Sequence, residues 1–309
     1  MSGPDIPSLF ELAGVTKTYG SVTALDNLSI RVPPGATGLL GPNGSGKTTM
    51  IRTLLGLIRP DRGGGTVFGM DILRRQLDIR RQIGFSPEDE CLFPGVQGIE
   101  FVAYAGELVG MPSTDAMQRA HEVLDYAGLG EVRYRKVESY SSGMKQRLKL
   151  PAAIVHDPKL LILDEPTNGM DPAGREDMLR LAYDLANNKG MSVLFSSHLL
   201  PDVEAVCGHI VVLAGGRLLV QGGIRELKQA HAGSFELRLK SDDEDFARRI
   251  SGQGCDVQIR GDMLLVKIPS GQTAGLLWRE AAAANCQIRH LRPQRSTLEE
   301  VFLKAVEQT

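Results

Sequence analysis

The stretch Gly-Pro-Asn-Gly-Ser-Gly-Lys-Thr at residues 41–48 constrains the fold more than any other part of this chain. A short apolar run, Ala-Thr-Gly-Leu-Leu, precedes it, and an amphipathic run follows it directly. Glycines let the backbone wrap closely around a ligand, so that several N–H groups can converge on phosphate oxygens where a helix begins. The pattern G-x-x-x-x-G-K-[ST] between a strand and a helix therefore predicts an α/β protein with a phosphate-binding loop.

The side chains of this loop suit the β- and γ-phosphates of a nucleotide. Lys47 places a positive charge there, and Thr48 offers a hydroxyl oxygen to Mg²⁺. Tyr19, ahead of the loop, could stack on a base, although a core position fits it equally well. The residues that we expect to bind the nucleotide are Tyr19, Gly41, Pro42, Asn43, Gly44, Ser45, Gly46, Lys47, Thr48 and Thr49.

Two further segments end in polar residues that suit the same site. Residues 160–163 are four consecutive apolar residues, typical of a parallel strand buried on both faces, and Asp164 and Glu165 follow. Open α/β sheets bind ligands at the carboxyl ends of such strands, so Asp164 can hold Mg²⁺ and Glu165 can orient water as a general base. His198 ends the similar run Val-Leu-Phe-Ser-Ser, which predicts a contact with the γ-phosphate at the same sheet edge.

The sequence divides into a large and a small part. Residues 1–230 form the predicted nucleotide-binding domain, in which strands alternate with helices, a pattern that predicts a parallel sheet with right-handed crossovers. Apolar residues at helical spacing within residues 88–155 predict a helical subdomain. Residues 231–309 read strand, helix, strand, strand, helix, strand and a last helix, which is the order of a small ferredoxin-like α+β domain.

Composition narrows the classes of function. The net charge is −2 over 309 residues and the pI is near 6.3, so we expect no nucleic-acid partner. The four cysteines are scattered without a Cys-x-x-Cys pair, which argues against a zinc site and fits a reducing compartment. No signal peptide and no run of about 18 apolar residues is present, so we expect a cytoplasmic protein that reaches a membrane only through a partner.

The stretch YSSGMKQR at residues 140–147, upstream of LLILDEP, completes a recognisable set. With the phosphate loop and His198, these residues resemble the ATP-binding-cassette ATPases, the nucleotide-binding subunits of ABC transporters, over about residues 8–225. The resemblance implies an ABC-type cassette fold with a mixed sheet core, ATP and Mg²⁺ as ligands, and two copies packed head to tail. Ser141, Ser142 and Gly143 would then contact the ATP of the second copy, and Asp171 would lie in the loop that crosses between the two sites.

The same resemblance implies a place for the chain in a larger machine. ATP hydrolysis would be transmitted through the Glu88 loop and the helical subdomain to separate membrane-spanning permease subunits, which would hold the chain on the inner face of the cell membrane. RSTLEEVFLKAV at residues 295–306 is similar to the tail of cassettes that serve drug- and sodium-exporting systems. This likeness implies export, with the C-terminal domain as a dimer contact or a regulator.

Three positions depart from the family pattern. Ser142 stands at the first glycine of the usual Leu-Ser-Gly-Gly-Gln signature. Glu88 stands where glutamine is usual; a carboxylate donates no hydrogen bond but can hold Mg²⁺ or water, so Glu88 joins Thr48 and Asp164 as a metal candidate and is also a catalytic candidate. Pro151 lies in the helix after the signature, where it removes a backbone hydrogen bond and favours a kink. These departures concern the rate of hydrolysis more than its existence.

Other classes of function remain open from the sequence. A soluble cassette ATPase acting on ribosomes or nucleic acid usually carries two cassettes or long coiled coils, whereas this chain has one phosphate loop and no heptad run. A GTPase or a kinase could use the same loop, but a GTPase needs Asn-Lys-x-Asp, and residues 188–191, Asn-Lys-Gly-Met, lack the aspartate. A binding module with negligible turnover is the last alternative, to which Ser142 lends weight.

Overall fold

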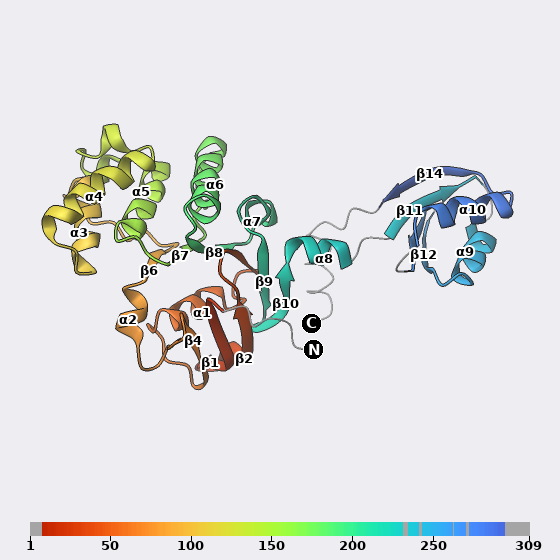
Figure 1. Ribbon diagram of the computed structural model, residues 1–309, viewed down its shortest axis with the longest axis horizontal. Coiled ribbons are helices and arrows are strands. Elements are labelled where there is room, and N and C mark those ends of the chain that lie inside the picture. Colours follow the sequence, from red (N-terminus) through yellow and green to blue (C-terminus); the bar gives the residue numbers. More distant parts are fainter. Residues whose placement is uncertain (1–7, 231–233, 241–242, 262, 270–271, 294–309) are drawn as a thin grey trace. The chain divides into compact units, whose positions relative to one another are not determined.

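The structure, a computed structural model, describes residues 8–230, 234–240, 243–261, 263–269 and 272–293. The described chain forms two compact units, one comprising residues up to 224 and the other the residues from 225 onward (Figure 1). The predicted last helix and the exporter-like tail at residues 295–306 lie outside the described residues. None of the described helices is both long and apolar enough to cross a lipid bilayer.

A six-stranded sheet forms the centre of the first unit, in the order β10-β9-β3-β8-β7-β6. Its five strands from β9 to β6 are parallel and β10 is antiparallel to β9, so the predicted mixed sheet is confirmed. β7 and β8 are buried along their whole length, as their continuous apolar runs predict. The strands are β3 (Ala36–Leu40), β6 (Ile83–Ser86), β7 (Leu160–Asp164), β8 (Ser192–Ser197), β9 (His209–Ala214) and β10 (Arg217–Gly223).

An antiparallel sheet with the order β2-β1-β4-β5 adjoins the central sheet. One hydrophobic core contains Val15 and Leu25 from this sheet, Ile51 and Leu54 from helix α1, and Ile162 from β7. Because this core includes both sheets and the helix that follows the phosphate loop, it fixes the loop at the edge of the central sheet. The elements are β1 (Phe10–Tyr19), β2 (Val22–Val32), α1 (Lys47–Leu54), β4 (Arg62–Val67), β5 (Met70–Asp71) and α2 (Gln76–Arg80).

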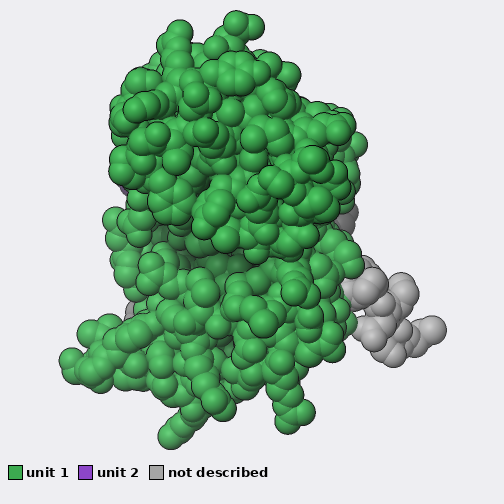
Figure 2. All heavy atoms as spheres, turned by 90° about the vertical axis from the view of Figure 1, so that its left-hand side faces the viewer, with its two compact units in different colours: residues 1–224, 309 green, residues 225–308 purple. Residues whose placement is uncertain are grey.

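Helices occupy most of residues 98–154, which confirms the expected helical character of this segment. They are α3 (Gly98–Leu108), α4 (Ser113–Tyr126), η1 (Gly130–Val132), η2 (Val137–Ser139) and α5 (Ser142–Ile154), and α6 (Pro172–Asn187) and α7 (Leu200–Val206) follow later in the chain. The N-cap of α5 is Ser141, whose hydroxyl accepts a hydrogen bond from Met144 N at 3.2 Å. The helix continues through Pro151 to its end. Figure 2 shows one face of the first unit in space-filling form.

The second unit contains a four-stranded antiparallel sheet with the order β12-β13-β11-β14, and three helices among its described residues. This strand order and the alternation of elements confirm the predicted ferredoxin-like fold. Its core is apolar and includes Leu237, Phe246, Leu264, Val266 and Leu277. The elements are α8 (Ile224–Ala230), β11 (Ser234–Leu239), α9 (Asp243–Ser251), β12 (Asp256–Arg260), β13 (Met263–Lys267), α10 (Gly275–Ala283) and β14 (Ile288–Pro293).

Candidate functional site

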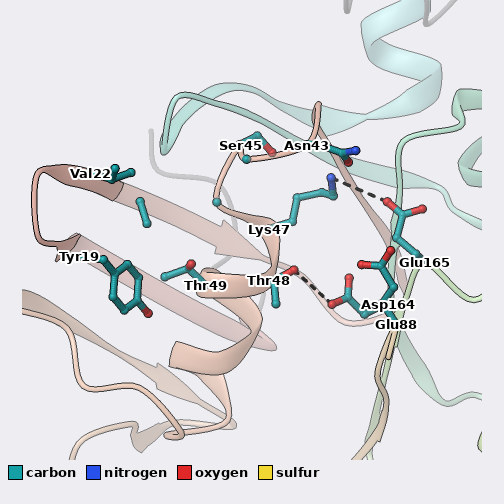
Figure 3. Close-up of a pocket in the computed structure, with 13 residues that line it drawn as sticks. Tyr19, Val22, Asn43, Ser45, Lys47, Thr48, Thr49, Glu88, Asp164 and Glu165 are labelled. Atoms are coloured by element: carbon teal, nitrogen blue, oxygen red, sulfur yellow. Dashed lines mark hydrogen bonds and ion pairs between the residues drawn. The ribbon is translucent and has the colours of Figure 1, made fainter. Parts of the chain in front are cut away.

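A cavity of about 450 Å³ opens where the parallel strands β3, β7 and β6 end (Figure 3). Parallel strands place their carboxyl ends at one sheet edge, so the segments that follow them meet there. The structure thus brings together most of the residues predicted for the site. The residues that line the cavity are Tyr19, Val22, Ala24, Asn43, Gly44, Ser45, Gly46, Lys47, Thr48, Thr49, Glu88, Asp164 and Glu165.

Two glycines of the phosphate loop have no room for a side chain. A Cβ on Gly46 would lie 2.5 Å from Ala24 O, and Gly46 has a φ of 102°, a left-handed conformation that glycine adopts without strain. A Cβ on Gly41 would lie 2.4 Å from Leu213 O. The tight loop leads into α1. The first N–H groups of this helix have no acceptor within it, so they can donate hydrogen bonds to an anion.

Lys47 lies at the start of α1 and is almost completely buried. Its ammonium group donates to Gly41 O at 2.8 Å and to Pro42 O at 3.4 Å, so it turns back over the loop. Gly41 and Pro42, which are not among the cavity-lining residues, therefore act on the site through Lys47. The ammonium also lies 3.8 Å from Glu165 Oε1, which places a cation and an anion side by side within the cavity wall.

Asp164 ends β7 and is buried with one oxygen atom unpaired. Its Oδ2 accepts a hydrogen bond from Thr48 Oγ1 at 3.4 Å, while Oδ1 has no hydrogen-bond partner among the described residues. Burial raises the pKa of Asp164, and the neighbouring carboxylates of Glu88 and Glu165 add to this rise, while the Ser196 hydroxyl and the Lys47 charge lower the pKa in part. A buried, partnerless carboxylate oxygen beside a hydroxyl and a second carboxylate is the donor set that suits a divalent cation such as Mg²⁺.

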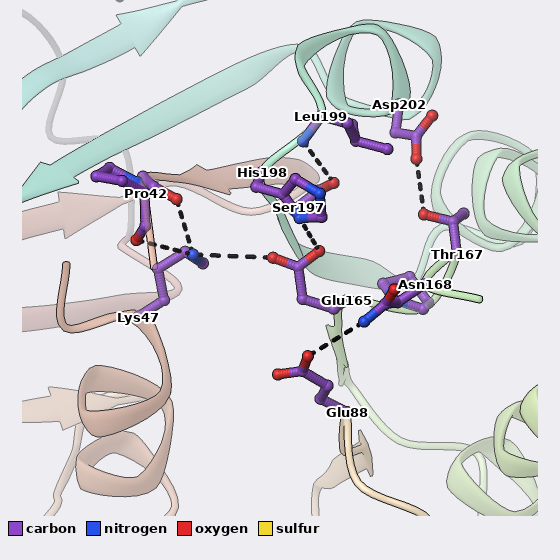
Figure 4. A network of polar contacts seen from close by, with 12 residues as sticks. Pro42, Lys47, Glu88, Glu165, Thr167, Asn168, Ser197, His198, Leu199 and Asp202 are labelled. Atoms are coloured by element: carbon purple, nitrogen blue, oxygen red, sulfur yellow. Dashed lines mark hydrogen bonds and ion pairs between the residues drawn. The ribbon is translucent and has the colours of Figure 1, made fainter. Parts of the chain in front are cut away.

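Glu165 directly follows β7 and is held from several sides. Its Oε2 lies 2.9 Å from His198 Nδ1, a hydrogen bond that a ring with a proton on Nδ1 donates (Figure 4). Its backbone has a φ of 48°, which is rare for a non-glycine residue and costs on the order of 1–3 kcal/mol. Gln146 of α5 donates to Glu165 O at 3.3 Å and to Pro166 O at 3.0 Å, and so supports this strained segment from its own helix. His198 itself is not a cavity-lining residue and acts on the site through Glu165.

Glu88 lies two residues beyond β6 and lines the cavity. Asn168 Nδ2 donates to Glu88 Oε1 at 3.3 Å, which joins the Glu88 loop to the segment after Glu165 (Figure 4). Behind the loop, the buried side chain of Lys149 donates to three successive backbone carbonyls, those of Pro87, Glu88 and Asp89. The predicted side chain therefore reaches the site on a loop that is fastened from two sides.

Tyr19 lies at the far end of the cavity, together with Val22 (Figure 3). Its side chain is 46% exposed, so the core position that the sequence left open does not describe it. Lys17 Nζ lies 5.5 Å from the centre of the Tyr19 ring, within the range of a cation–π contact. An exposed aromatic ring at the rim of a phosphate-binding cavity is free to stack on a planar base.

Comparison with known proteins identifies the family. The sequence profile described as "ABC transporter" matches residues 25–168, and the profile "ATP-binding protein DrrA1-3-like, C-terminal domain" matches residues 222–306. The chain is 35% identical to the daunorubicin/doxorubicin resistance ATP-binding protein DrrA of Streptomyces peucetius, over 95% of this chain and 91% of DrrA. The chain belongs to the ABC transporter ATP-binding proteins. It is the ATPase subunit of such a transporter.

Other members of the ABC transporter family agree with this assignment. The linearmycin resistance ATP-binding protein LnrL of Bacillus subtilis is 33% identical over 97% of this chain and 99% of LnrL. The dimeric structure of MJ0796, a bacterial ABC transporter cassette, superposes with a TM-score of 0.65 at 26% identity, covering 70% of this chain and 99% of that cassette. A post-hydrolysis state of the same cassette, bound to ADP and Pi, has the same TM-score and identity.

The signature residues of this ABC ATPase lie away from its own phosphate loop. Ser141 and Gly143 line neither the nucleotide cavity nor the cavity beside it, and Ser142 lines only the second, of about 240 Å³. Asp171 is the N-cap of α6 and accepts from Gly174 N at 3.2 Å. Their contact with the ATP of a second copy stays a prediction.

The sequence did not single out three side chains that support the cassette site: Gln146, Lys149 and Asn168. Gln146 and Lys149 lie in the signature helix α5, and Asn168 follows Glu165 by three residues. A lysine or an amide in a basic helix reads as a solvated residue, so composition and spacing gave no signal for them. Lys149 alone left a hint, since it stands between the apolar residues Leu148 and Leu150.

An ion pair with a buried carboxylate supports the same region of the ABC ATPase. Asp202 of α7 is buried. Its carboxylate accepts hydrogen bonds from Thr167 Oγ1 at 2.7 Å and from Arg175 Nε at 2.8 Å. Thr167 follows Glu165, and Asp202 follows His198 in the chain. The network therefore ties together the two segments that carry Glu165 and His198.

Proposed function

We propose that this chain binds Mg-ATP in the cavity of the phosphate loop and hydrolyses it to drive export through separate membrane subunits. The observation that carries the proposal is the convergence of Lys47, Asp164 and Glu165 on one cavity. A phosphate-binding loop, a metal-type carboxylate and a general base that meet there are the parts that hydrolysis of a nucleoside triphosphate requires.

Binding of the triphosphate is assigned to the loop. The N–H groups at the start of α1 and the ammonium of Lys47 face the position of the phosphates, and Tyr19 takes the base at the rim. On binding, the Lys47 ammonium would exchange its contacts with the loop carbonyls and Glu165 for phosphate oxygens. The remaining loop residues supply backbone donors, and their glycines allow the close approach.

The metal site is assigned to Thr48, Asp164 and Glu88. The unpaired Oδ1 of Asp164 and the hydroxyl of Thr48 are oxygen atoms that can coordinate the metal, and Glu88 lines the same cavity. Bound Mg²⁺ neutralises charge on the phosphate oxygens. The raised pKa of Asp164 supports this assignment, because an anionic side chain that burial destabilises gains most from a cation.

The hydrolytic step is assigned to Glu165 with His198 beside it. The Glu165 carboxylate can accept a hydrogen bond from the attacking water and orient it in line with the γ-phosphate. His198 lies within hydrogen-bond distance of Glu165 and is half exposed, so its ring can also reach the γ-phosphate from the open side. The strained backbone at Glu165 aims the carboxylate across the cavity at Lys47.

We further infer that two copies pair head to tail and dock on permease subunits at the inner face of the cell membrane. The dimer of the related cassette MJ0796 supports the pairing, and the position of Ser142 outside its own nucleotide cavity fits a role toward a second copy. The relatives named for resistance to daunorubicin/doxorubicin and to linearmycin support export.

An affinity purification from detergent-solubilised membranes of the native host tests this function. The bait is the Glu165→Gln variant with Mg-ATP, which is expected to hold two copies together, and Lys47→Ala is the matched bait that cannot hold ATP. Recovery of a polytopic membrane protein in stoichiometric amount with both baits, and of a second copy with Glu165→Gln only, supports the proposal. Recovery of ribosomal or nucleic-acid-bound proteins without a membrane protein would overturn it in favour of a soluble cassette.

A further inference from the structure

Lys149 has surroundings that are unusual for a lysine. Its side chain is 4% exposed, in a helix whose neighbouring residues Leu148 and Leu150 are fully buried. Burial of an ammonium group away from water is costly unless each N–H finds an acceptor, and burial lowers the pKa of Lys149. A lysine at this position therefore needs a specific set of partners.

The partners are three consecutive carbonyl groups of the Glu88 loop. Lys149 Nζ donates to Pro87 O at 2.7 Å, to Glu88 O at 3.0 Å and to Asp89 O at 3.3 Å. An ammonium has three N–H donors, so these carbonyls account for all of them. The loop backbone thus curls around the ammonium group, while the Glu88 side chain accepts from Asn168 and lines the nucleotide cavity.

Lys149 lies on the same face of α5 as residues at the start of this helix, where the signature lies. Ser142, Lys145 and Lys149 are spaced at i, i+3 and i+7, which places them along one side of α5, and all three line the second cavity with Glu88. Gln146 of the same helix holds the backbone of Glu165. One rigid helix is therefore fastened to the loop of the metal candidate and to the segment of the general base.

We propose that Lys149 is a positioning residue that locks the Glu88 loop to α5, so that the nucleotide site and the signature end of this helix move as one body. A copy whose signature engages another copy's ATP would then shift its own Glu88 and Glu165 together. The inference rests on the proposed function, because it assigns to Lys149 a role in ATP hydrolysis, namely when hydrolysis takes place. ATP binding itself depends on the phosphate loop, which Lys149 does not touch.

The test compares steady-state ATP hydrolysis by the full-length wild type with four variants. Lys149→Met keeps the length of the side chain and removes its donors, Lys149→Gln keeps an amide, and Lys149→Arg keeps a charged donor group. Lys159→Met is the control, because Lys159 is exposed and belongs neither to α5 nor to the Glu88 loop. The kcat values are normalised to titrated ATP-binding sites, so that a partly unfolded preparation does not lower them.

We expect Lys149→Met to lower kcat by about tenfold or more, since small displacements of catalytic groups are costly, while the KM for ATP changes by less than about twofold. Lys149→Gln should fall between Met and wild type, Lys149→Arg should restore part of kcat, and Lys159→Met should match the wild type. A purely structural role would instead lower the melting temperature and leave the normalised kcat unchanged, which would overturn the proposal. If Lys149→Met does not fold, the order wild type, Arg, Gln in kcat decides the question. A wild type without hydrolysis would defeat the proposed function, whereas an active wild type with an equally active Lys149→Met defeats this inference alone.

Discussion

The two units differ in what they bury. Among the described residues, every buried polar or charged side chain lies between Thr37 and Asp202, and none lies in the second unit. The second unit has an apolar core of the kind that burial of hydrocarbon alone can stabilise. Both units belong to one chain, so the difference reflects the different function of each core.

Five of the buried polar side chains in the first unit are charged: Lys47, Lys149, Asp164, Glu165 and Asp202. A buried charge weakens a fold unless its partners compensate, and replacement by apolar residues is often neutral or stabilising. Each of the five faces the cavity or fastens a segment that does. The comparison indicates that the first unit buries charges that lower its stability because the reaction needs them. The described part of the second unit buries no such charges.

The largest effect should follow from Lys47→Ala. The loop loses its point charge, and the nearby Glu165 carboxylate loses the cation 3.8 Å away. We expect loss of tight ATP binding and of measurable hydrolysis, checked by equilibrium binding of a fluorescent ATP analogue and by phosphate release. Lys159→Ala, at an exposed lysine, is the control, and near-normal turnover of Lys47→Ala would contradict the phosphate-loop assignment.

A smaller effect is expected from Glu165→Gln, which removes the general base but preserves the shape of the side chain. ATP binding should persist, while hydrolysis slows by at least ~10²-fold, by analogy with other losses of a general base. Size-exclusion chromatography with Mg-ATP should then show an accumulated dimer. Glu176→Gln, at an exposed glutamate of α6, should change neither property, and a fully active Glu165→Gln variant would remove Glu165 from the catalytic role.

The parts of the site differ in how far the sequence could predict them. The phosphate loop is contiguous, so its residue types and its position between β3 and α1 were readable without any long-range information. Asp164 and His198 were readable because parallel strands end at a common edge, which makes the end of each apolar run a predictable place. The ferredoxin-like order of the second unit followed from alternating periodicity in the same way.

The supporting contacts were not readable, for physical reasons. Lys149 binds backbone carbonyls 60 to 62 residues away, and a carbonyl leaves no mark on the sequence. Asn168 reaches Glu88 over 80 residues, and Thr167 reaches Asp202 over 35 residues. Side chains that act through backbone atoms or through uncharged partners carry no complementary pattern, so only the packed structure reveals them.

A third prediction concerns the cost of the buried metal-type carboxylate. Asp164→Asn should raise the melting temperature of the protein without metal or nucleotide, because burial and the nearby carboxylates raise the pKa of Asp164 and disfavour its charged form. A raised pKa in the folded state means that the wild type is relatively most stable below the ordinary aspartate pKa of about 3.9 and loses that advantage as the pH rises. The gap between variant and wild type should therefore widen from acid toward neutral pH.

Thermal unfolding in buffer with a chelator, repeated at several pH values, checks this. Asp256→Asn, at an exposed aspartate of the second unit, should show no such widening. Added Mg²⁺ should stabilise the wild type more than Asp164→Asn. A variant that is less stable than the wild type at neutral pH would show that Asp164 contributes to the fold and would weaken the contrast between the two units.

The smallest effect on hydrolysis should come from the core of the second unit. Leu277 of α10 is fully buried in an apolar cluster, and Leu277→Ala should cost that unit ~2–5 kcal/mol through lost burial and a cavity. Among the described residues of this unit there is no buried charge and no residue that lines the nucleotide cavity, so kcat measured below the melting transition should stay at the wild-type value. Calorimetry of the full chain should show a lowered transition for this unit alone. If kcat falls together with that transition, the second unit takes part in turnover, as a dimer contact would. Its apolar core would then contribute to hydrolysis indirectly, and the contrast between the two units would not hold.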